Sequence, residues 1–304
     1  MEISVVIVNW NTCDLLRQCL QSVYRTVREI AFEVIVVDNG STDGSVAMLE
    51  AEFPGVRIIA NGENRGFAAA NNQALRVMSG RYALLLNSDA VLMEDAAASL
   101  HRFMEGQPEA AMAFGQLLNA DGSKQNSIAA FPTLWTLLAN TSLLEYLFPR
   151  RYPSKRYPHP GPIGIESGIG ACMLVRKTAV DAVGMLDERY FFFFEETDWC
   201  FRMRRAGWKI YHVPAARIVH YQGQSIGRNV RSRIAFYRAR YQFFRKWQSG
   251  PYNAAVRIVV FLRLAVDCLL TSLGVLLTLG LKQALRDRWM VYVHLLLWHL
   301  KGCP

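Results

Sequence analysis

Asp89 has both the chemistry and the position of a divalent-cation ligand. It closes the polar run Asn87-Ser88-Asp89, which directly follows the unbroken apolar stretch 82–86. Such a stretch is typical of a buried parallel strand, and open α/β sheets bind ligands beyond the carboxyl ends of their strands. A carboxylate is a hard oxygen donor that suits a cation carrying a diphosphate. The alternative interpretation is structural, because these residue types also cap helices, here a helix from Glu94.

Glu195, Glu196 and Asp198 place three carboxylates directly after four phenylalanines, residues 191–194. Burial against an apolar patch raises the pKa of a carboxyl group, which makes it a better proton acceptor near neutral pH. These residues are therefore candidates for a general base. In the alternative interpretation they form the acidic first turn of a helix, which the helix dipole stabilises.

Three further positions could bind a nucleotide or a metal. Asp38 ends an apolar strand before a Gly- and Ser-rich turn, where a carboxylate can accept hydrogen bonds from ribose hydroxyls or a base N–H. Asn64 and Gly66 open a helix whose small residues allow close backbone approach and whose N-terminus favours anions. His220 is an isolated histidine that could bind a metal or a phosphate, although such a residue is often structural.

The elements that would position these side chains alternate between strand and helix. Expected strands cover residues 3–8, 33–37, 56–60, 82–86, 110–118 and 209–213. Segments of helical periodicity lie between most of them, with Ala-rich residues 67–78 as an example. This alternation predicts right-handed βαβ units and an α/β fold with a mostly parallel sheet flanked by helices.

Several common site classes are excluded by the sequence. No G-x-G-x-x-G follows the first strand and no G-x-x-x-x-G-K-[ST] occurs, which disfavours a dinucleotide fold and a P-loop enzyme. The six cysteines include no C-x-x-C pair, so neither a zinc site nor a disulfide framework is indicated. Met1-Glu2 leads straight into a strand without a basic leader, so we expect a catalytic part on the cytosolic side.

The C-terminal part is more apolar than the rest of the chain and is preceded by a basic segment. Fourteen Arg and Lys residues and no Asp or Glu lie between Trp199 and Val266, within a net charge of +9. Such a block favours an anionic partner, and before an apolar segment it favours the cytoplasmic leaflet of a membrane. We therefore expect a catalytic domain over residues 1–250 and a membrane-association region over 251–304.

Two modes of membrane association are open. Residues 264–281 would span about 27 Å as a helix, close to the ~30 Å hydrocarbon core, but Asp267 lies among them. Residues 289–300 would span only about 18 Å. The region could lie in the membrane interface as a monotopic or re-entrant pair, or it could cross the membrane; a buried subdomain or dimer interface is the alternative to both.

Six short motifs occur in order along residues 1–245: 5–11 (VVIVNWN), 37–45 (VDNGSTDGS), 64–72 (NRGFAAANN), 86–89 (LNSD), 170–176 (GACMLVR) and 194–200 (FEETDWC). Together they resemble the family-two inverting glycosyltransferases with the GT-A fold, particularly the rhamnosyltransferase-like branch. The LNSD motif departs from the family's DxD pattern, because Asn87 replaces the first Asp. FEETDWC departs from the Glu-Asp-x-Asp pattern, because Glu196 stands where Asp is usual.

The resemblance implies a role for each matching position. Asp38 would contact the nucleotide base, Asp89 would bind Mg²⁺ or Mn²⁺ and the diphosphate, and Glu196 would be the base, with Glu195 as the other candidate. His220, with Gly223 and Ser225, would lie near the metal and diphosphate. The other donor-binding positions would be Asn9, Asn64, Gly66, Asn87, Ser88, Gly170, Ala171, Arg176 and Asp198.

The resemblance implies transfer of a sugar, with rhamnose as a candidate, from a UDP- or dTDP-linked donor to a lipid-linked or glycan acceptor. The expected location is the cytoplasmic face of the inner membrane, with no nucleic-acid partner. A nucleotidyltransferase is an alternative, although it would usually carry a Gly-rich basic loop after the first strand. A non-catalytic protein that binds anionic lipid or nucleic acid through the basic segment is another, but the clustered carboxylates would repel phosphate unless a cation intervened.

Overall fold

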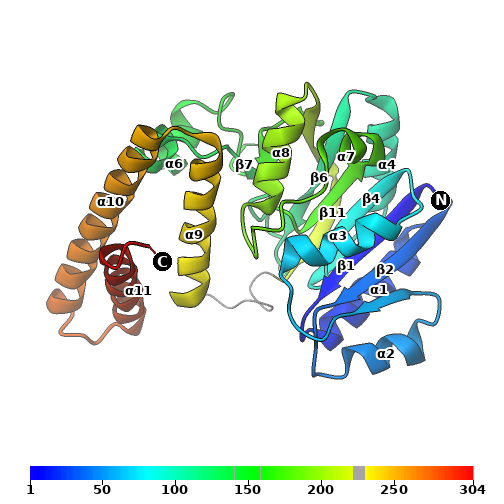
Figure 1. Ribbon diagram of the computed structural model, residues 1–304, viewed down its shortest axis with the longest axis horizontal. Coiled ribbons are helices and arrows are strands. Elements are labelled where there is room, and N and C mark those ends of the chain that lie inside the picture. Colours follow the sequence, from blue (N-terminus) through cyan, green and yellow to red (C-terminus); the bar gives the residue numbers. More distant parts are fainter. Residues whose placement is uncertain (140, 158, 222–229, 304) are drawn as a thin grey trace. The chain divides into compact units, whose positions relative to one another are not determined.

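The computed structural model describes residues 1–303 except residues 140, 158 and 222–229 (Figure 1). Two compact units make up this part of the chain. The first comprises residues 1–131 and 149–225, and the second comprises residues 132–148 and 226–304. The division differs from the boundary expected at residue 250, since the basic helix before that position belongs to the second unit.

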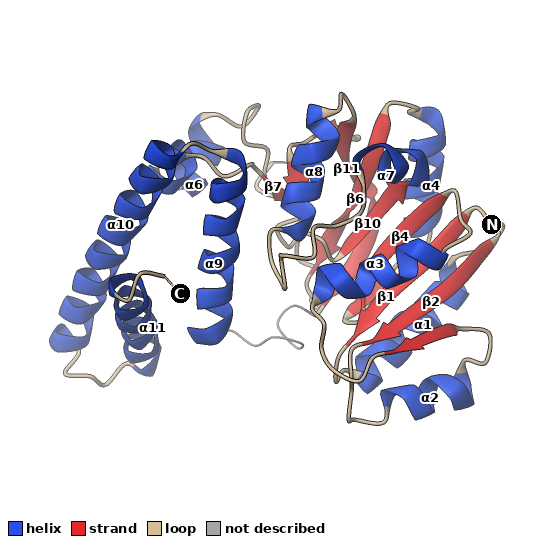
Figure 2. Ribbon diagram, viewed as in Figure 1, coloured by secondary structure: helices blue, strands red, loops and turns tan. Residues whose placement is uncertain are grey.

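The first unit is built on a mixed sheet with the strand order β3-β2-β1-β4-β10-β6-β11-β5 (Figure 2). Its strands are β1 (Ile3–Asn9), β2 (Phe32–Asp38), β3 (Arg57–Ala60), β4 (Tyr82–Asn87), β5 (Ala90–Leu92), β6 (Ala110–Leu118), β10 (Cys172–Arg176) and β11 (Lys209–His220). β8 (Ile163–Gly164) pairs with β11, while β7 (Ile128–Ala129) and β9 (Ser167–Gly168) form a separate pair. The pairs of β1 with β2 and β4, β2 with β3, and β6 with β11 are parallel.

Helices cover both faces of the sheet because the strands are apolar on both sides. One face packs on α1 (Cys13–Thr26), α2 (Ser45–Glu52) and α4 (Ala96–Gly106). The other packs on α3 (Phe67–Val77), α7 (Lys177–Val183) and α8 (Glu195–Arg205). Leu16, Leu20 and Leu100 on the first face and Trp199 on the second are fully buried. The predicted mostly parallel α/β architecture flanked by helices is confirmed.

The register of the parallel strands aligns the polar residues at their carboxyl ends. Asn9 at the end of β1 pairs with Asp38 at the end of β2, and Val8 pairs with Asn87 at the end of β4. Because β11 extends to His220, well past the expected end at Val213, it reaches the same edge. The unexpected short strand β5 pairs antiparallel with it.

The second unit is helical. It contains α5 (Leu134–Leu138), α6 (Thr141–Leu147), α9 (Val230–Trp247), α10 (Gly250–Leu277) and α11 (Gln283–Leu300). Its core joins Leu137 of α5 to aromatic and aliphatic side chains of α9, α10 and α11, namely Tyr241, Phe244, Val256, Val260, Leu264, Leu295 and Trp298. This shared core explains why α9 groups with the C-terminal helices. Helix α10 is long and apolar enough to cross a membrane by length and composition.

Helices α5 and α6 were not predicted from the sequence, although they lie inside the catalytic segment. The chain leaves the first unit after Phe131 and re-enters it at residue 149, and Glu166 contacts the chain near both of these points. One carboxylate oxygen of Glu166 accepts a hydrogen bond from the Phe131 backbone N–H at 2.7 Å, and the other pairs with Arg151 at 2.7 Å. The remainder of the proline-rich segment 149–162 is loop apart from the undescribed residue 158.

Candidate active site

A buried polar network joins the ends of β1, β2 and β4. The Asn9 amide donates to Asp38 Oδ1 at 2.8 Å, and the Ser41 backbone N–H donates to Asp38 Oδ2 at 2.8 Å. Thr12 donates to Asn9 Oδ1 at 2.7 Å and shares a hydrogen bond with Ser88 at 2.8 Å. Asp38 is only 1% exposed. The network fixes the side chains of Asn9, Asp38 and Ser88 in one row along the carboxyl edge.

The loop before α3 is held beside this row by the Asn39 amide, which donates to Asn64 Oδ1 and to the Gly66 carbonyl, both at 3.3 Å. Asn64 Oδ1 also accepts a hydrogen bond from the Gly66 backbone N–H at 2.9 Å. Gly66 has a φ of +85°, and a Cβ there would lie 2.7 Å from the carbonyl oxygen of Phe191. Phe67 donates its backbone N–H to the same carbonyl at 2.8 Å. The expected small-residue turn therefore lies against the start of the phenylalanine run.

Asp89 and His220 lie together where β4 passes into β5. Ala90 pairs with His220 in the β5–β11 ladder, and the Tyr221 backbone N–H donates to the Asp89 carbonyl at 2.9 Å. His220 Nε2 lies 3.4 Å from Asp89 Oδ1, and both residues are buried, with exposed fractions of 6% and 3%. Two residues that are 131 positions apart in the sequence thus form one pair.

Gln125, which the sequence did not single out, orients this histidine. Its amide nitrogen donates to the His220 carbonyl at 2.6 Å, so its amide oxygen faces His220 Nδ1 at 3.0 Å. An oxygen there requires Nδ1 to carry the proton, and in the neutral ring Nε2 then presents a lone pair toward Asp89. Such orientation of a metal-binding histidine by its second nitrogen is common in metal sites.

The Asp89–His220 pair fits a divalent cation. Asp89 Oδ1 is buried and accepts no hydrogen bond within the described residues, and the same holds for Asn87 Oδ1. A carboxylate oxygen and an imidazole lone pair at this separation repel each other unless a proton or cation lies between them. Carboxylate, amide and imidazole ligands suit Mn²⁺, and the oxygen ligands alone suit Mg²⁺.

Glu195 and Glu196 lie in the first turn of α8, directly after two residues with left-handed backbone conformation. Phe193 and Phe194 adopt φ angles of +71° and +68°, which turn the chain sharply into the helix. Glu195 and Glu196 each have one buried carboxylate oxygen with no hydrogen-bond partner among the described residues. Burial raises the pKa of Glu196 to about 7, and burial together with repulsion from Glu196 raises the pKa of Glu195.

Gly170 and Ala171 connect the two acidic groups. A Cβ at Gly170 would lie 3.6 Å from Cβ and Cγ of Glu196, and the Ala171 carbonyl accepts a hydrogen bond from the Asn87 backbone N–H at 3.0 Å. Glu196 therefore lies next to the loop that borders the end of β4. The structure brings the expected base and the expected metal ligand to the same edge of the sheet.

Two expected donor-binding residues have other contacts. Arg176 pairs with Tyr82 at the start of β4 and donates to the carbonyls of Ala110 and Met104, so its predicted place at the nucleotide site is wrong. The reason is that β10 runs antiparallel to β4, which carries its last residue to the opposite edge. Asp198 is fully buried and pairs with Arg202 at 3.0 Å. Gly223 and Ser225 lie outside the described residues.

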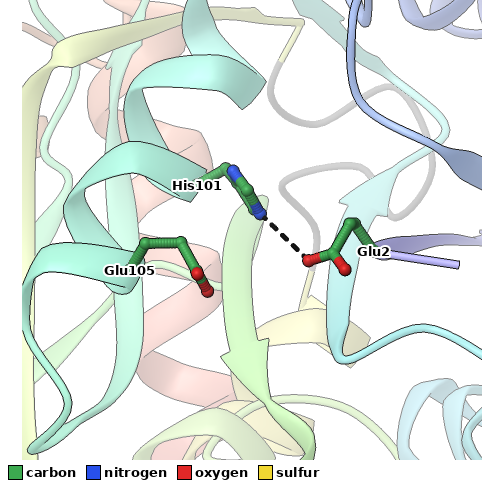
Figure 3. Close-up of side chains that lie close together, drawn as sticks. All are labelled: Glu2, His101 and Glu105. Atoms are coloured by element: carbon green, nitrogen blue, oxygen red, sulfur yellow. Dashed lines mark ion pairs between the residues drawn. The ribbon is translucent and has the colours of Figure 1, made fainter.

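Glu2, His101 and Glu105 form another group of possible metal ligands at the amino edge of the sheet (Figure 3). His101 Nε2 lies 3.5 Å from Glu2 Oε2. Arg81 already supplies a cation to this group, since its guanidinium lies 2.9 Å from Glu2 and 3.2 Å from Glu105. Because both carboxylates already pair with Arg81, this group is a weaker candidate for a metal site than Asp89 and His220.

Comparisons with known proteins agree on one family. The model for "Glycosyl transferase family 2" matches residues 4–184. An N-acetylglucosaminyl-diphospho-decaprenol L-rhamnosyltransferase of Mycobacterium tuberculosis is 31% identical over 74% of this chain and 78% of its own length. The low-salt glycan biosynthesis hexosyltransferase Agl10 of Haloferax volcanii is 24% identical over 73% of this chain and 67% of its own.

Solved structures show the same fold at low sequence identity. The mannosyltransferase PcManGT from Pyrobaculum calidifontis, in complex with GDP-Man and Mn²⁺, has a TM-score of 0.59 at 16% identity and covers 99% of this chain and 87% of its own. GalNAc-T7 with UDP, GalNAc and Mn²⁺ has a TM-score of 0.58 at 16% identity, over 79% of this chain and 47% of its own. With the family match, these neighbours confirm the GT-A fold, and the chain belongs to glycosyltransferase family 2.

Proposed function

We propose that this protein transfers a sugar, with inversion, from a UDP- or dTDP-linked donor to a hydroxyl group of a lipid-linked or glycan acceptor. The observation that carries the proposal is the placement of the Asp89–His220 pair and the half-buried Glu196 at one edge of the sheet. Membership of family 2 favours glycosyl transfer over nucleotidyl transfer and over a purely binding role.

The donor would lie along the carboxyl edge of β1, β2 and β4. Asp38 and Asn9 would hold the nucleoside, and the turn at Asn64 and Gly66 would leave room for close approach of the backbone. Asp89 and His220 would hold Mg²⁺ or Mn²⁺, and the Mn²⁺ in both solved relatives supports this. When bound, such a cation neutralises charge on the leaving diphosphate.

Glu196 would act as the general base. Its carboxylate takes the proton of the acceptor hydroxyl while the acceptor oxygen bonds to the anomeric carbon. The bond from that carbon to the diphosphate oxygen breaks at the same time, and its electron pair leaves with the nucleoside diphosphate. A single displacement inverts the anomeric centre without a covalent enzyme intermediate. A pKa of about 7 suits Glu196 to this role.

The relatives and the second unit support the proposed acceptor and location. The mycobacterial relative is named for an N-acetylglucosaminyl-diphospho-decaprenol substrate. Helix α10 and the basic residues before it support membrane association at the cytoplasmic face. A lipid diphosphate acceptor would be presented at that surface.

The test uses the purified full-length protein. Thermal unfolding would be followed with UDP-, dTDP- and GDP-sugars, each with Mg²⁺, with Mn²⁺ and without metal, and transfer would then be assayed on N-acetylglucosaminyl-diphospho-polyprenol. We expect a metal-dependent rise in Tm with a uridine or thymidine donor, and transfer with inversion. If no nucleotide sugar raised the Tm, with or without metal, the proposal would be contradicted.

The rate of transfer should depend on pH through Glu196. Because this carboxylate accepts the proton, kcat/KM should fall about tenfold per pH unit below its pKa, which burial raises to about 7, and level off above it. A pH–rate profile from pH 5 to 9 at saturating metal measures this. A plateau that extends down to pH 5 would show that an unperturbed carboxylate, or no carboxylate, serves as the base.

A further inference from the structure

Helix α10 presents one continuous apolar face that no other described element of the helical unit covers. The large exposed side chains of this face are Ile258, Leu262, Val266, Leu269, Leu273 and Leu276, with exposed fractions between 48% and 69%, and Leu270 and Leu277 are also exposed beside it. Their spacing of three or four residues places them on one side of the helix. We call this face the α10 stripe; it extends about 27 Å along the helix axis.

The opposite side of α10 is packed. Val256, Val260 and Leu264 are buried in the core of the helical unit. At 100° per residue, the charged residues Arg257, Arg263 and Asp267 point away from the stripe. Arg263 donates to the Leu137 carbonyl at 2.7 Å, so its charge is turned toward α5. The stripe is therefore free of charge along its whole length.

Helix α11 packs along α10. It runs antiparallel to α10, because Gly274 lies beside Leu285 and Phe261 lies beside His299. Exposed Arg286, Asp287 and Arg288 directly follow Leu285 and so lie at the level of Gly274. Gly274 lies only three residues before the end of α10 at Leu277, so these charges lie beside the C-terminal end of that helix.

The midpoint of α10 (Gly250–Leu277) lies near residue 264, so a membrane-spanning α10 would draw its own Arg263 and Asp267 toward the bilayer centre. Each central charge costs about 2.5–3.5 kcal/mol even on the most permissive scale. The apolar part of α11, about 18 Å long, is also too short to accompany α10 across. With α10 lying flat, the same charges can remain among the lipid headgroups.

Charge selects an anionic lipid surface as the partner of the stripe. Residues 250–304 carry six Lys or Arg and two Asp or Glu. Two copies of this unit would bring like charges together, whereas acidic headgroups would be attracted to the basic side chains that flank the apolar face.

We propose that α10 lies in the plane of an anionic bilayer, with the α10 stripe immersed in the acyl chains, and does not cross the membrane. This proposal rests on the proposed membrane association and defines its geometry. It leaves Arg263 and Asp267 outside the acyl chains and binds the protein to one leaflet.

Spin-label depth measurements on the full-length protein test the orientation. Single labels are placed at L262C, L269C and L276C after replacement of Cys13, Cys268 and Cys303 by Ser, since Cys19, Cys172 and Cys200 are buried. R257C on another side of the same helix is the matched control. The protein is bound to vesicles of phosphatidylcholine and phosphatidylglycerol, and immersion depth is measured from collisions with oxygen and a nickel chelate.

We expect the three stripe labels to be immersed at equal depth and the R257C label to be exposed to water. A spanning helix would instead separate the depths of residues 262 and 269 by about 10 Å and would overturn the proposal. The proposal would also be overturned if the protein did not bind the vesicles, or if it bound them with the stripe labels still exposed to water. Sugar transfer to a detergent-dispersed acceptor in the same variants would show that the proposed activity stands independently of this result.

Discussion

The Glu196→Gln variant is expected to lose sugar transfer by a factor of ~10²–10⁴ while it remains folded, because glutamine cannot take the acceptor proton. The change is nearly isosteric, so donor binding should persist. Single-turnover transfer and donor-induced thermal shifts measure the two effects separately. Glu195→Gln, the same substitution at the neighbouring position, is the matched control and should retain most of the rate. A loss confined to Glu195→Gln would assign the base to Glu195.

The pH dependence of the stability of Glu196→Gln tests whether the pKa of Glu196 is raised in the folded protein. In the folded wild type the pKa of Glu196 is raised to about 7 from 4.5, so between these values the folded state binds more protons than the unfolded state. Wild-type stability must then fall as pH rises through this window. Glutamine does not titrate, so the variant should be more stable than wild type at pH 8, by up to roughly 3 kcal/mol, and equal to it near pH 4. Thermal unfolding at both pH values would measure this.

The Asp89→Ala variant is expected to abolish the metal-dependent stabilisation by nucleoside diphosphate as well as transfer. His220 and Asn87 would remain, but no carboxylate would be left to balance the cation. Ligand at about 100 times its Kd stabilises a protein by about 2.7 kcal/mol, and this gain should disappear. Thermal unfolding with UDP or dTDP and Mn²⁺ measures it without reference to activity.

The control for Asp89→Ala is Glu2→Gln, which removes a carboxylate from the other carboxylate–imidazole group (Figure 3). That substitution should leave the metal dependence unchanged, because Arg81 already forms ion pairs with both carboxylates of the group. Retained stabilisation by nucleotide and Mn²⁺ in Asp89→Ala would exclude Asp89 as the ligand, and its loss in Glu2→Gln would place the metal at the amino edge.

The sequence predicted the parallel half of the sheet because β1, β2 and β4 are continuous apolar runs that end in polar residues. It also indicated which ends would carry ligands, since the carboxyl ends of parallel strands share one edge. The place of Arg176 was wrong because strand direction is not visible in an apolar pentapeptide. Because β10 runs antiparallel to β4, its last residue lies at the amino edge of the sheet and not at the carboxyl edge.

Long-range pairings and very short helices were beyond the reach of local patterns. Gln125 orients His220 from 95 positions away, and neither residue has a periodic signal that reveals its partner. Helices α5 and α6 have five and seven residues, too few to display a helical repeat. The helical unit was expected to begin at residue 251 because hydropathy rises there. Aromatic packing of Tyr241 and Phe244 joins the preceding basic helix to it.

The insertion of α5 and α6 into the catalytic segment also bears on how the protein can be shortened. The polypeptide passes between the two units at three points, near residues 131, 148 and 225. A chain cut after residue 225 would retain Leu137 but lose the aromatic neighbours that shelter it from water. Such a fragment would be prone to self-association. A monodisperse soluble form would need residues 132–148 to be replaced by a short polar linker, with the contacts of Glu166 to Phe131 and Arg151 retained.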